Sequence, residues 1–126
     1  MDIQAFFRAV VEQNADALRS FFCAGAEIRW HNTNELFTVE EYIQANCQYP
    51  GQWEGELERV EPLASGSLAT AAHVYAREGG PSFHVASFIR LEAGKIAALD
   101  EYWGDDGPAP AWRRAMRVGR PIREGD

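Results

Sequence analysis

The N-terminal part of the chain has the spacing of apolar residues that is typical of amphipathic helices. Apolar side chains recur three and four positions apart over residues 3–11, which predicts a first helix that ends at about Gln13. Asn14 is a favourable N-cap for a second helix. Its apolar pattern continues to Phe22, and Gly25 can take the left-handed conformation that ends a helix. The pattern therefore predicts two consecutive helices before residue 26.

From Ala26 the hydrophobic period changes to two. Ile28, Trp30 and Asn32 share one face of this segment, and the charged or polar residues between them share the other. The alternation predicts a half-buried strand with Trp30 and Asn32 on its inner face.

A third helix has the clearest local signal in the sequence. Thr38 and Glu41 form a capping box, in which each side chain accepts a hydrogen bond from a backbone N–H at the helix start. Phe37 and Tyr42 occupy the two positions of a hydrophobic staple. The sequence predicts a helix that begins at Thr38 and ends near Gln48, before a Tyr-Pro-Gly turn.

After Trp53 the sequence shows no helical period. Short turn signals separate four strand-like runs, which are residues 54–63, 67–78, 82–92 and 95–103. Connections this short join antiparallel neighbours, because a parallel crossover needs a dozen or more residues. Helices followed by a meander of strands predict an α+β fold in which the helices cover one face of the sheet.

The length and the end of the chain define the expected domain. We expect one domain over residues 1–126, with a core over 1–103 and a tail over 104–126. Residues 112–117 can form a short docking helix in that tail. Five of the twelve basic residues follow Trp112: Arg113, Arg114, Arg117, Arg120 and Arg123. We interpret the tail as a solvated segment, or as one that pairs with the acidic body, in preference to a nucleic-acid-binding segment.

Composition narrows the classes of partner. Hydrophobic residues make up 46% of the sequence and charged residues 25%, as in globular proteins. The net charge of -7 disfavours nucleic acid and anionic membranes as partners. No apolar run approaches the roughly 18 residues of a membrane helix, and the first residues lack the basic region of a signal peptide. We therefore expect a cytoplasmic protein.

The cysteines and histidines are not spaced like metal ligands. Cys23 and Cys47 lack CxxC spacing, so we expect buried free thiols rather than zinc ligands or a catalytic nucleophile. The three histidines, His31, His73 and His84, show no i, i+4 pairing. The sequence therefore predicts no metal site, and we expect no cofactor.

Several short motifs, in this order along the chain, resemble one known superfamily. They are Trp30-His31-Asn32, the stretch from Phe37 to Ile43, Gly94-Lys95-Ile96 and Glu101-Tyr102-Trp103. Their order resembles the nuclear transport factor 2-like superfamily, particularly its SnoaL-like branch, over nearly the whole chain. The last two motifs are similar to the final strand of that family.

This resemblance implies a cystatin-like cone, in which a strongly curved sheet wraps a helix and leaves a cavity open at one end. It also implies a homodimer formed through the outer face of the sheet. Members include ketosteroid isomerases, polyketide cyclases, dehydratases and limonene-epoxide hydrolase-like enzymes, together with proteins that only bind ligands or partners. The resemblance therefore implies the fold more firmly than the function.

The final strand offers a candidate catalytic carboxylate. Leu99, Glu101 and Trp103 share one face, and by resemblance to the epoxide hydrolase-like members Glu101 is the inward acid. A carboxylate in an apolar cavity has a raised pKa and can exchange protons near neutral pH. The alternative places Glu101 at the sheet rim in an ion pair with Arg90. A bulge in this strand would bring Asp100 inward instead, so Asp100 is the reserve candidate.

Two histidines complete the candidate chemistry. His73 and Tyr75 share a face with two small alanines, which suits a tapering cavity, so we expect both to point inward. His73 can then form an acid–base pair with Glu101, although a hydrogen-bonded core histidine is the alternative. His84 is expected on the outer face, as a dimer contact.

The expected cavity lining is aromatic and polar. Its members are Trp30, Asn32, Tyr42, Trp53, Tyr75 and Trp103. By resemblance, Asn32 matches the water-holding Asn of the epoxide hydrolase-like members. The sequence lacks the Tyr and paired Asp of a steroid isomerase oxyanion hole, and it lacks an Arg–Asp pair beside Asn32, so neither activity is implied.

Three functions remain open at this point. The first is the binding of a small, largely apolar or ring-containing molecule in the cone. The second is an isomerase, cyclase, dehydratase or hydrolase in which Glu101, with His73 or Asn32, acts as general acid–base. The third is a protein-interaction module with the same fold and no catalysis.

Overall fold

The computed structural model describes residues 1–123, which form six strands, four short α-helices and one 3₁₀ turn. In chain order these elements are α1 (Ile3–Val11), α2 (Ala15–Arg19), β1 (Phe22–Trp30), η1 (His31–Thr33), β2 (Glu35–Phe37), α3 (Val39–Cys47), β3 (Trp53–Pro62), β4 (Leu68–Ala76), β5 (Ser82–Glu92), β6 (Lys95–Asp105) and α4 (Ala111–Ala115). Within residues 1–123 no helix is long and apolar enough to cross a membrane.

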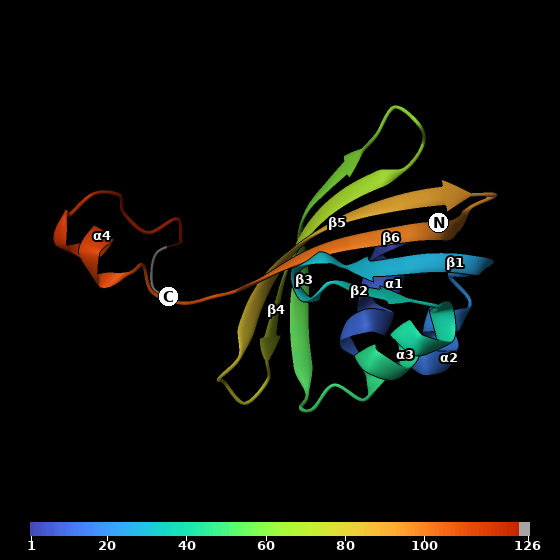
Figure 1. The fold of residues 1–126 in the computed structure, drawn as a ribbon, viewed down its shortest axis with the longest axis horizontal. Coiled ribbons are helices and arrows are strands. Elements are labelled where there is room, and N and C mark those ends of the chain that lie inside the picture. The colour runs from blue at the N-terminus through green and yellow to red at the C-terminus, as the bar shows by residue number, and fades with distance from the viewer. Residues whose placement is uncertain (124–126) are drawn as a thin grey trace.

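The six strands form one sheet in the order β2-β1-β6-β5-β4-β3. The predicted meander from β3 to β6 is confirmed, and each of its neighbours is antiparallel. The sheet is mixed, however, because β1 pairs with β6 in parallel. The segment that connects these two strands contains α3 and the rest of the meander, which is ample for a parallel crossover. Figure 1 shows α1, α2 and α3 gathered on one side of the strongly twisted sheet, as the predicted α+β fold requires.

Side-chain caps define the starts of the three N-terminal helices. The Asn14 side chain accepts a hydrogen bond from Ala17 N at 3.2 Å, so the predicted N-cap is confirmed. The capping box of α3 is also confirmed: Thr38 Oγ1 accepts from Glu41 N at 3.2 Å, and Glu41 Oε1 accepts from Thr38 N at 2.8 Å. These contacts satisfy N–H groups that have no partner inside the helix.

The second helix is shorter than predicted. It ends at Arg19, and Phe22 begins β1 rather than continuing the helix to Gly25. Apolar residues close together fit a buried strand as well as a helix, and the pairing of Phe22 with Ile96 of β6 decides between them. Gly25 has a φ of +76° within a bulge of β1, so its left-handed conformation serves the strand instead.

The hydrophobic core lies between the three N-terminal helices and the inner face of the sheet, which we define as the face that these helices cover. It contains Phe6, Ala9, Leu18, Phe22, Ala26, Ile28, Tyr42, Ile43, Ile89, Ile96 and Leu99. Edge-to-face contacts link Phe22 to Phe6 and to Tyr42, at centroid distances of 5.9 and 5.6 Å. These contacts hold α1 and α3 on the same strand.

A glycine allows α1 to approach β3 closely. A Cβ atom at Gly55 would lie 2.8 Å from the carbonyl oxygen of His73 and 2.9 Å from Phe7 Cζ. Any side chain at this position would therefore push α1 away from the sheet.

The C-terminal tail leads away from the sheet to α4 (Figure 1). The predicted short helix forms, but the expectation that it docks is wrong, because none of its residues is buried and Trp112 is 65% exposed. Cys23 and Cys47 are free thiols as predicted, although they are half-buried rather than buried.

Candidate functional site

A cavity of about 450 Å³ opens between the N-terminal helices and the inner face of the sheet. Five aromatic side chains line it: Trp30, Tyr49, Trp53, Phe83 and Trp103. Four of these rings form a continuous series of contacts, from Tyr49 to Trp53 at 5.6 Å, from Trp53 to Phe83 at 5.7 Å and from Phe83 to Trp103 at 5.9 Å. The wall is therefore a rigid aromatic surface supplied mainly by β3, β5 and β6.

Amide side chains fix the helical side of the cavity. Gln13 Nε2 donates to the carbonyl oxygens of Asn46 and Tyr49, at 2.9 and 2.8 Å. Asn46 Nδ2 donates in return to the Val10 carbonyl at 3.1 Å. These hydrogen bonds join the end of α1 to the end of α3, so two of the polar lining groups hold the wall in place.

The charges on the cavity wall are negative. The carboxylates of Glu35 and Asp105 belong to its lining, and the described part of the chain contributes no lysine or arginine to it. An anionic ligand would meet repulsion and no cationic partner, whereas a neutral or cationic ligand would not.

Glu101 lies beyond Trp103, on the inner face of β6. It is 7% exposed, and its two carboxylate oxygens accept hydrogen bonds from Trp30 Nε1 at 3.0 Å and from Ser87 Oγ at 2.9 Å. Burial raises the pKa of Glu101 above its usual 4.5, although the hydrogen bonds from Ser87 and Trp30 oppose this rise. The site thus holds a desolvated carboxyl group with two fixed donors.

A small space adjoins Glu101. Its volume is about 20 Å³, and Trp103 borders both this space and the large cavity. The buried indole N–H of Trp103 also acts to lower the pKa of Glu101, after the donors Ser87 and Trp30, but it makes no hydrogen bond of ordinary geometry within residues 1–123. A volume of this size accommodates about one water molecule, which this donor and the carboxylate could hold.

Known structures with the same architecture identify the fold. No family model matches this sequence, and no curated protein matches it. A proposed ketosteroid isomerase from Kribbella flavida is 20% identical over 98% of this chain and 90% of its own, with a TM-score of 0.76. An NTF-2 like protein of unknown function from Burkholderia xenovorans is 18% identical over 94% of this chain and 91% of its own, with a TM-score of 0.74. The fold is NTF2-like.

A third structure adds a bound small molecule. It is a protein from Catenulispora acidiphila with a ketosteroid isomerase-like fold, solved in complex with trimethylamine, and it is 14% identical over 79% of this chain and 82% of its own, with a TM-score of 0.66. At these identities the likenesses establish the NTF2-like fold of the chain and leave its activity open.

Four of the six predicted lining residues border the cavity of the NTF2-like cone: Trp30, Asn32, Trp53 and Trp103. The Asn32 side chain accepts from the Trp103 backbone N–H at 3.4 Å, which ties η1 to β6. Tyr42 does not border the cavity, because it is 1% exposed and packs in the core against Trp30 at 6.2 Å. Burial, and then the nearby Glu101, raise the pKa of Tyr42 well above its usual 10, so its phenol stays protonated.

The expected placement of His73 and Tyr75 is wrong. Thr70, Ala72 and Val74 of β4 face inward, so His73 and Tyr75 lie on the opposite, outer face. The strand carries small or apolar residues on both faces, and alternation alone therefore could not set its phase. The proposed pair of His73 and Glu101 is excluded, because the sheet separates them.

The predicted alternatives for the carboxylate are also wrong. Asp100 lies on the outer face, where its Oδ1 is 2.7 Å from His31 Nε2. Arg90 pairs with Glu92 at 2.7 Å rather than with Glu101. The register of β6 against β5 shifts at Ala97, before Leu99, so the alternation that points Glu101 inward is undisturbed.

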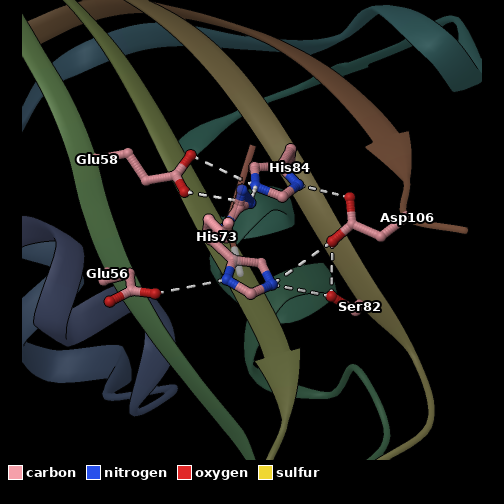
Figure 2. Close-up of polar contacts among 7 residues, drawn as sticks. Glu56, Glu58, His73, Ser82, His84 and Asp106 are labelled. Carbon is pink, nitrogen blue, oxygen red and sulfur yellow. Dashed lines mark hydrogen bonds and ion pairs between the residues drawn. The ribbon is translucent and has the colours of Figure 1, made fainter. Parts of the chain in front are cut away.

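Sequence reasoning missed a group of side chains on the outer face (Figure 2). His73 and His84 are cross-strand neighbours with parallel rings, 4.6 Å apart between centroids and inclined by 5°. Glu58 joins them because the register of β3 against β4 shifts at this residue, and this bulge turns its carboxylate toward His84. The Gly79-Gly80 turn between β4 and β5 was the available signal, since it sets the register that pairs the two histidines.

Proposed function

We propose that the protein binds a small, largely apolar or ring-containing molecule that is neutral or positively charged. The observation that carries this proposal is the cavity of about 450 Å³, which is lined by five aromatic rings and by carboxylates. This volume lies within the range of small-molecule sites. Aromatic faces attract cations, and the carboxylates of Glu35 and Asp105 would add to that attraction.

A fold neighbour supports this choice of ligand class. The Catenulispora acidiphila protein was solved in complex with trimethylamine, a small apolar base that is a cation at neutral pH. The open cavity also favours ligand binding over a protein-interaction module, which would need no such space.

Three probes that share one ring and differ in charge test the proposal. They are 2-naphthylmethyl-trimethylammonium, 2-naphthylmethanol and 2-naphthoate, each titrated into the full chain by isothermal titration calorimetry. We expect the ammonium and the alcohol to bind, with the ammonium tighter, and the naphthoate not to bind. Tightest binding of the naphthoate, or no binding of any probe, would contradict the proposal.

A matched pair of tryptophan variants locates the binding. Trp53 lines the cavity, and Trp112 is 65% exposed in the tail. Trp53→Leu should weaken binding of the ammonium probe by about tenfold, which corresponds to a stacking contact of about 1.4 kcal/mol. Trp112→Leu should leave it unchanged, and an equal loss in both variants would show that the probe binds elsewhere.

A second candidate is an enzyme in which Glu101 acts as general base. Its support is a buried carboxyl group with a raised pKa beside a small space that adjoins the cavity. The assay is deuterium exchange at the α-carbon of 2-tetralone, followed by NMR. Exchange that is faster with wild type than with Glu101→Gln supports the enzyme, while equal exchange leaves the binding protein as the better description.

We also propose that two copies pair through the outer face of the sheet. Phe88 and Tyr102 are 48% and 45% exposed there and contact each other at 6.0 Å. Sedimentation velocity should give a dimer for wild type and a monomer for Phe88→Glu. A monomer for wild type would contradict this assembly.

A further inference from the structure

The outer face of the sheet carries a compact group of metal-ligating side chains on the side opposite the cavity. Glu58, His73 and His84 each offer one ligand atom, and these three atoms all lie within 4.8 Å of one another. We call these three residues the outer cluster. Figure 2 shows that they project from β3, β4 and β5 on the same side of the sheet.

The two nitrogens of His84 have different partners. Nδ1 hydrogen-bonds to Asp106 Oδ1, and Nε2 lies 3.0 Å from the Arg123 guanidinium and 3.4 Å from Glu58 Oε1. In the neutral imidazole Nε2 accepts from Arg123, because a guanidinium only donates, so Nδ1 carries the proton and donates to Asp106. The lone pair of Nε2 is thus directed to the side where Glu58 lies.

His73 is arranged in the same way. Its Nε2 faces Ser82 Oγ at 3.0 Å and Asp106 Oδ2 at 3.5 Å. Its Nδ1 lies 3.5 Å from Glu56 Oε1, on the side of the β3 carboxylates. Both imidazoles therefore turn one nitrogen to Asp106 and the other toward a glutamate, as Figure 2 shows.

We propose that Glu58, His73 and His84 bind a zinc ion on the outer face of the sheet. Neutral imidazole nitrogens and a carboxylate oxygen are ligands that zinc prefers, at about 2.0–2.2 Å. Asp106 takes the role of the carboxylate that orients a ligating histidine through its second nitrogen. Glu56 or a water molecule can supply the fourth ligand.

Binding requires a modest rearrangement of the rings. A metal ion lies in the plane of each imidazole that binds it, and tetrahedral ligands at about 2.0–2.1 Å are about 3.4 Å apart. The two parallel rings must therefore tilt toward each other, and the three ligand atoms must close from separations of up to 4.8 Å. Side-chain rotation supplies this movement without a change in the strands.

The side chain of Arg123 already places a positive charge beside the proposed zinc ligands. The Arg123 guanidinium is 3.0 Å from His84 Nε2 and 3.6 Å from Glu58 Oε2, so it contacts two of the three proposed ligand residues. A zinc ion and this guanidinium cannot occupy both contacts at once. Zinc binding therefore competes with the attachment of the C-terminal tail to the sheet.

Zinc titration of the full chain, followed by isothermal titration calorimetry, tests the proposal. We expect one saturable site, and cobalt(II) at the same site should give the visible absorption of tetrahedral coordination. His73→Gln, His84→Gln and Glu58→Gln should each weaken zinc binding by more than about tenfold, and Asp106→Asn by about 10- to 100-fold. Circular dichroism of each variant confirms that its fold is retained.

The third histidine provides the matched control. His31 stacks on Tyr102 at 4.2 Å and hydrogen-bonds to Asp100, so it belongs to a separate contact. His31→Gln should bind zinc like wild type. Absence of a saturable site in wild type, or an equal loss of affinity in His31→Gln, would overturn the proposal.

A second pair of variants tests the competition. Arg123→Gln should tighten zinc binding by about two- to fivefold, because it removes a surface cation from two of the ligand residues. Arg120→Gln, which removes the same charge from the same tail, should leave the affinity unchanged. Weaker zinc binding in Arg123→Gln would refute the competition. The naphthyl probes should bind the cavity equally well with or without zinc, since the sheet lies between the two sites.

Discussion

The buried carboxyl group of Glu101 should make the stability of this protein depend on pH in a way that one substitution isolates. Glu101→Gln keeps the shape of the side chain, can still accept from Trp30 and can donate to the Ser87 hydroxyl. It removes only the ability to become charged in a site where the group is 7% exposed. The variant should therefore be more stable than wild type at neutral pH and close to wild type in acid.

The sign follows from proton binding. Burial raises the pKa of Glu101 above its usual 4.5, so between 4.5 and the raised value the folded protein holds a proton that the unfolded chain has lost. Stability of wild type therefore falls as pH rises through this interval, by about 1.4 kcal/mol for each unit between the two pKa values. Below pH 4.5 the penalty is absent, and above the raised pKa it is constant.

Urea unfolding from about pH 4 to about pH 8 measures the effect as the difference between Glu101→Gln and wild type, which cancels the titration of other groups. The difference should grow from pH 4.5 upward and then level off. Two curves that stay parallel over the whole range would refute the desolvation argument. Glu101→Leu separates charge from hydrogen bonding, because it leaves the Trp30 N–H and the Ser87 O–H unpaired, at a cost of about 1–3 kcal/mol each.

Three further substitutions test other parts of the fold. Thr38→Ala should lower the free energy of unfolding by about 1 kcal/mol through loss of the helix cap, and Thr38→Ser should retain most of it. Gly55→Ala should cost about 1–3 kcal/mol, because its Cβ would lie 2.8 Å from a backbone oxygen, while Gly104→Ala, with 4.0 Å of space, should cost much less. In an NMR titration the pKa of His84 should exceed its usual 6.5, owing to the hydrogen bond to Asp106, and should fall in Asp106→Asn. The stability that His84 contributes should be present below pH 6.5 and lost as pH rises through its raised pKa. Equal pKa values of His84 in wild type and in Asp106→Asn would contradict this account.

Local signals in the sequence predicted the parts of the fold that local contacts decide. The third helix was predicted within a residue at each end, because its capping box and the Tyr-Pro-Gly turn act within the segment itself. The strand 82–92 was predicted with its observed bounds, since Gly and Pro mark its start and Gly94 its end. The start of β1 was missed because it depends on the pairing of Phe22 with Ile96, which lies far along the chain.

The orientation of the site residues was predictable only where alternation was unambiguous. In β6 the apolar Leu99 and Trp103 lie two positions to either side of Glu101, so the three residues share a face, and that face could be assigned to the interior. In β4 both faces carry alanines, and the phase is set by the hairpin register with β5 and by packing under α1. His73 was therefore assigned to the wrong side, although the Gly79-Gly80 turn between β4 and β5 carried a signal for its pairing with His84.

The same alternation that hid the outer cluster explains how one thin sheet can support two unrelated environments. Along β5, Val85 and Ser87 face the core and Glu101, while His84 faces the outer carboxylates. The aromatic wall excludes water and raises the pKa of a buried acid, whereas on the outer face partly exposed acids surround the histidines and raise the pKa of His84. Because successive side chains point to opposite faces, a substitution on one face leaves the packing of the other largely intact. Ligand binding in the cavity and zinc binding outside should therefore respond to separate sets of residues, and the two sites share the backbone of β3, β4 and β5, which carry residues of both.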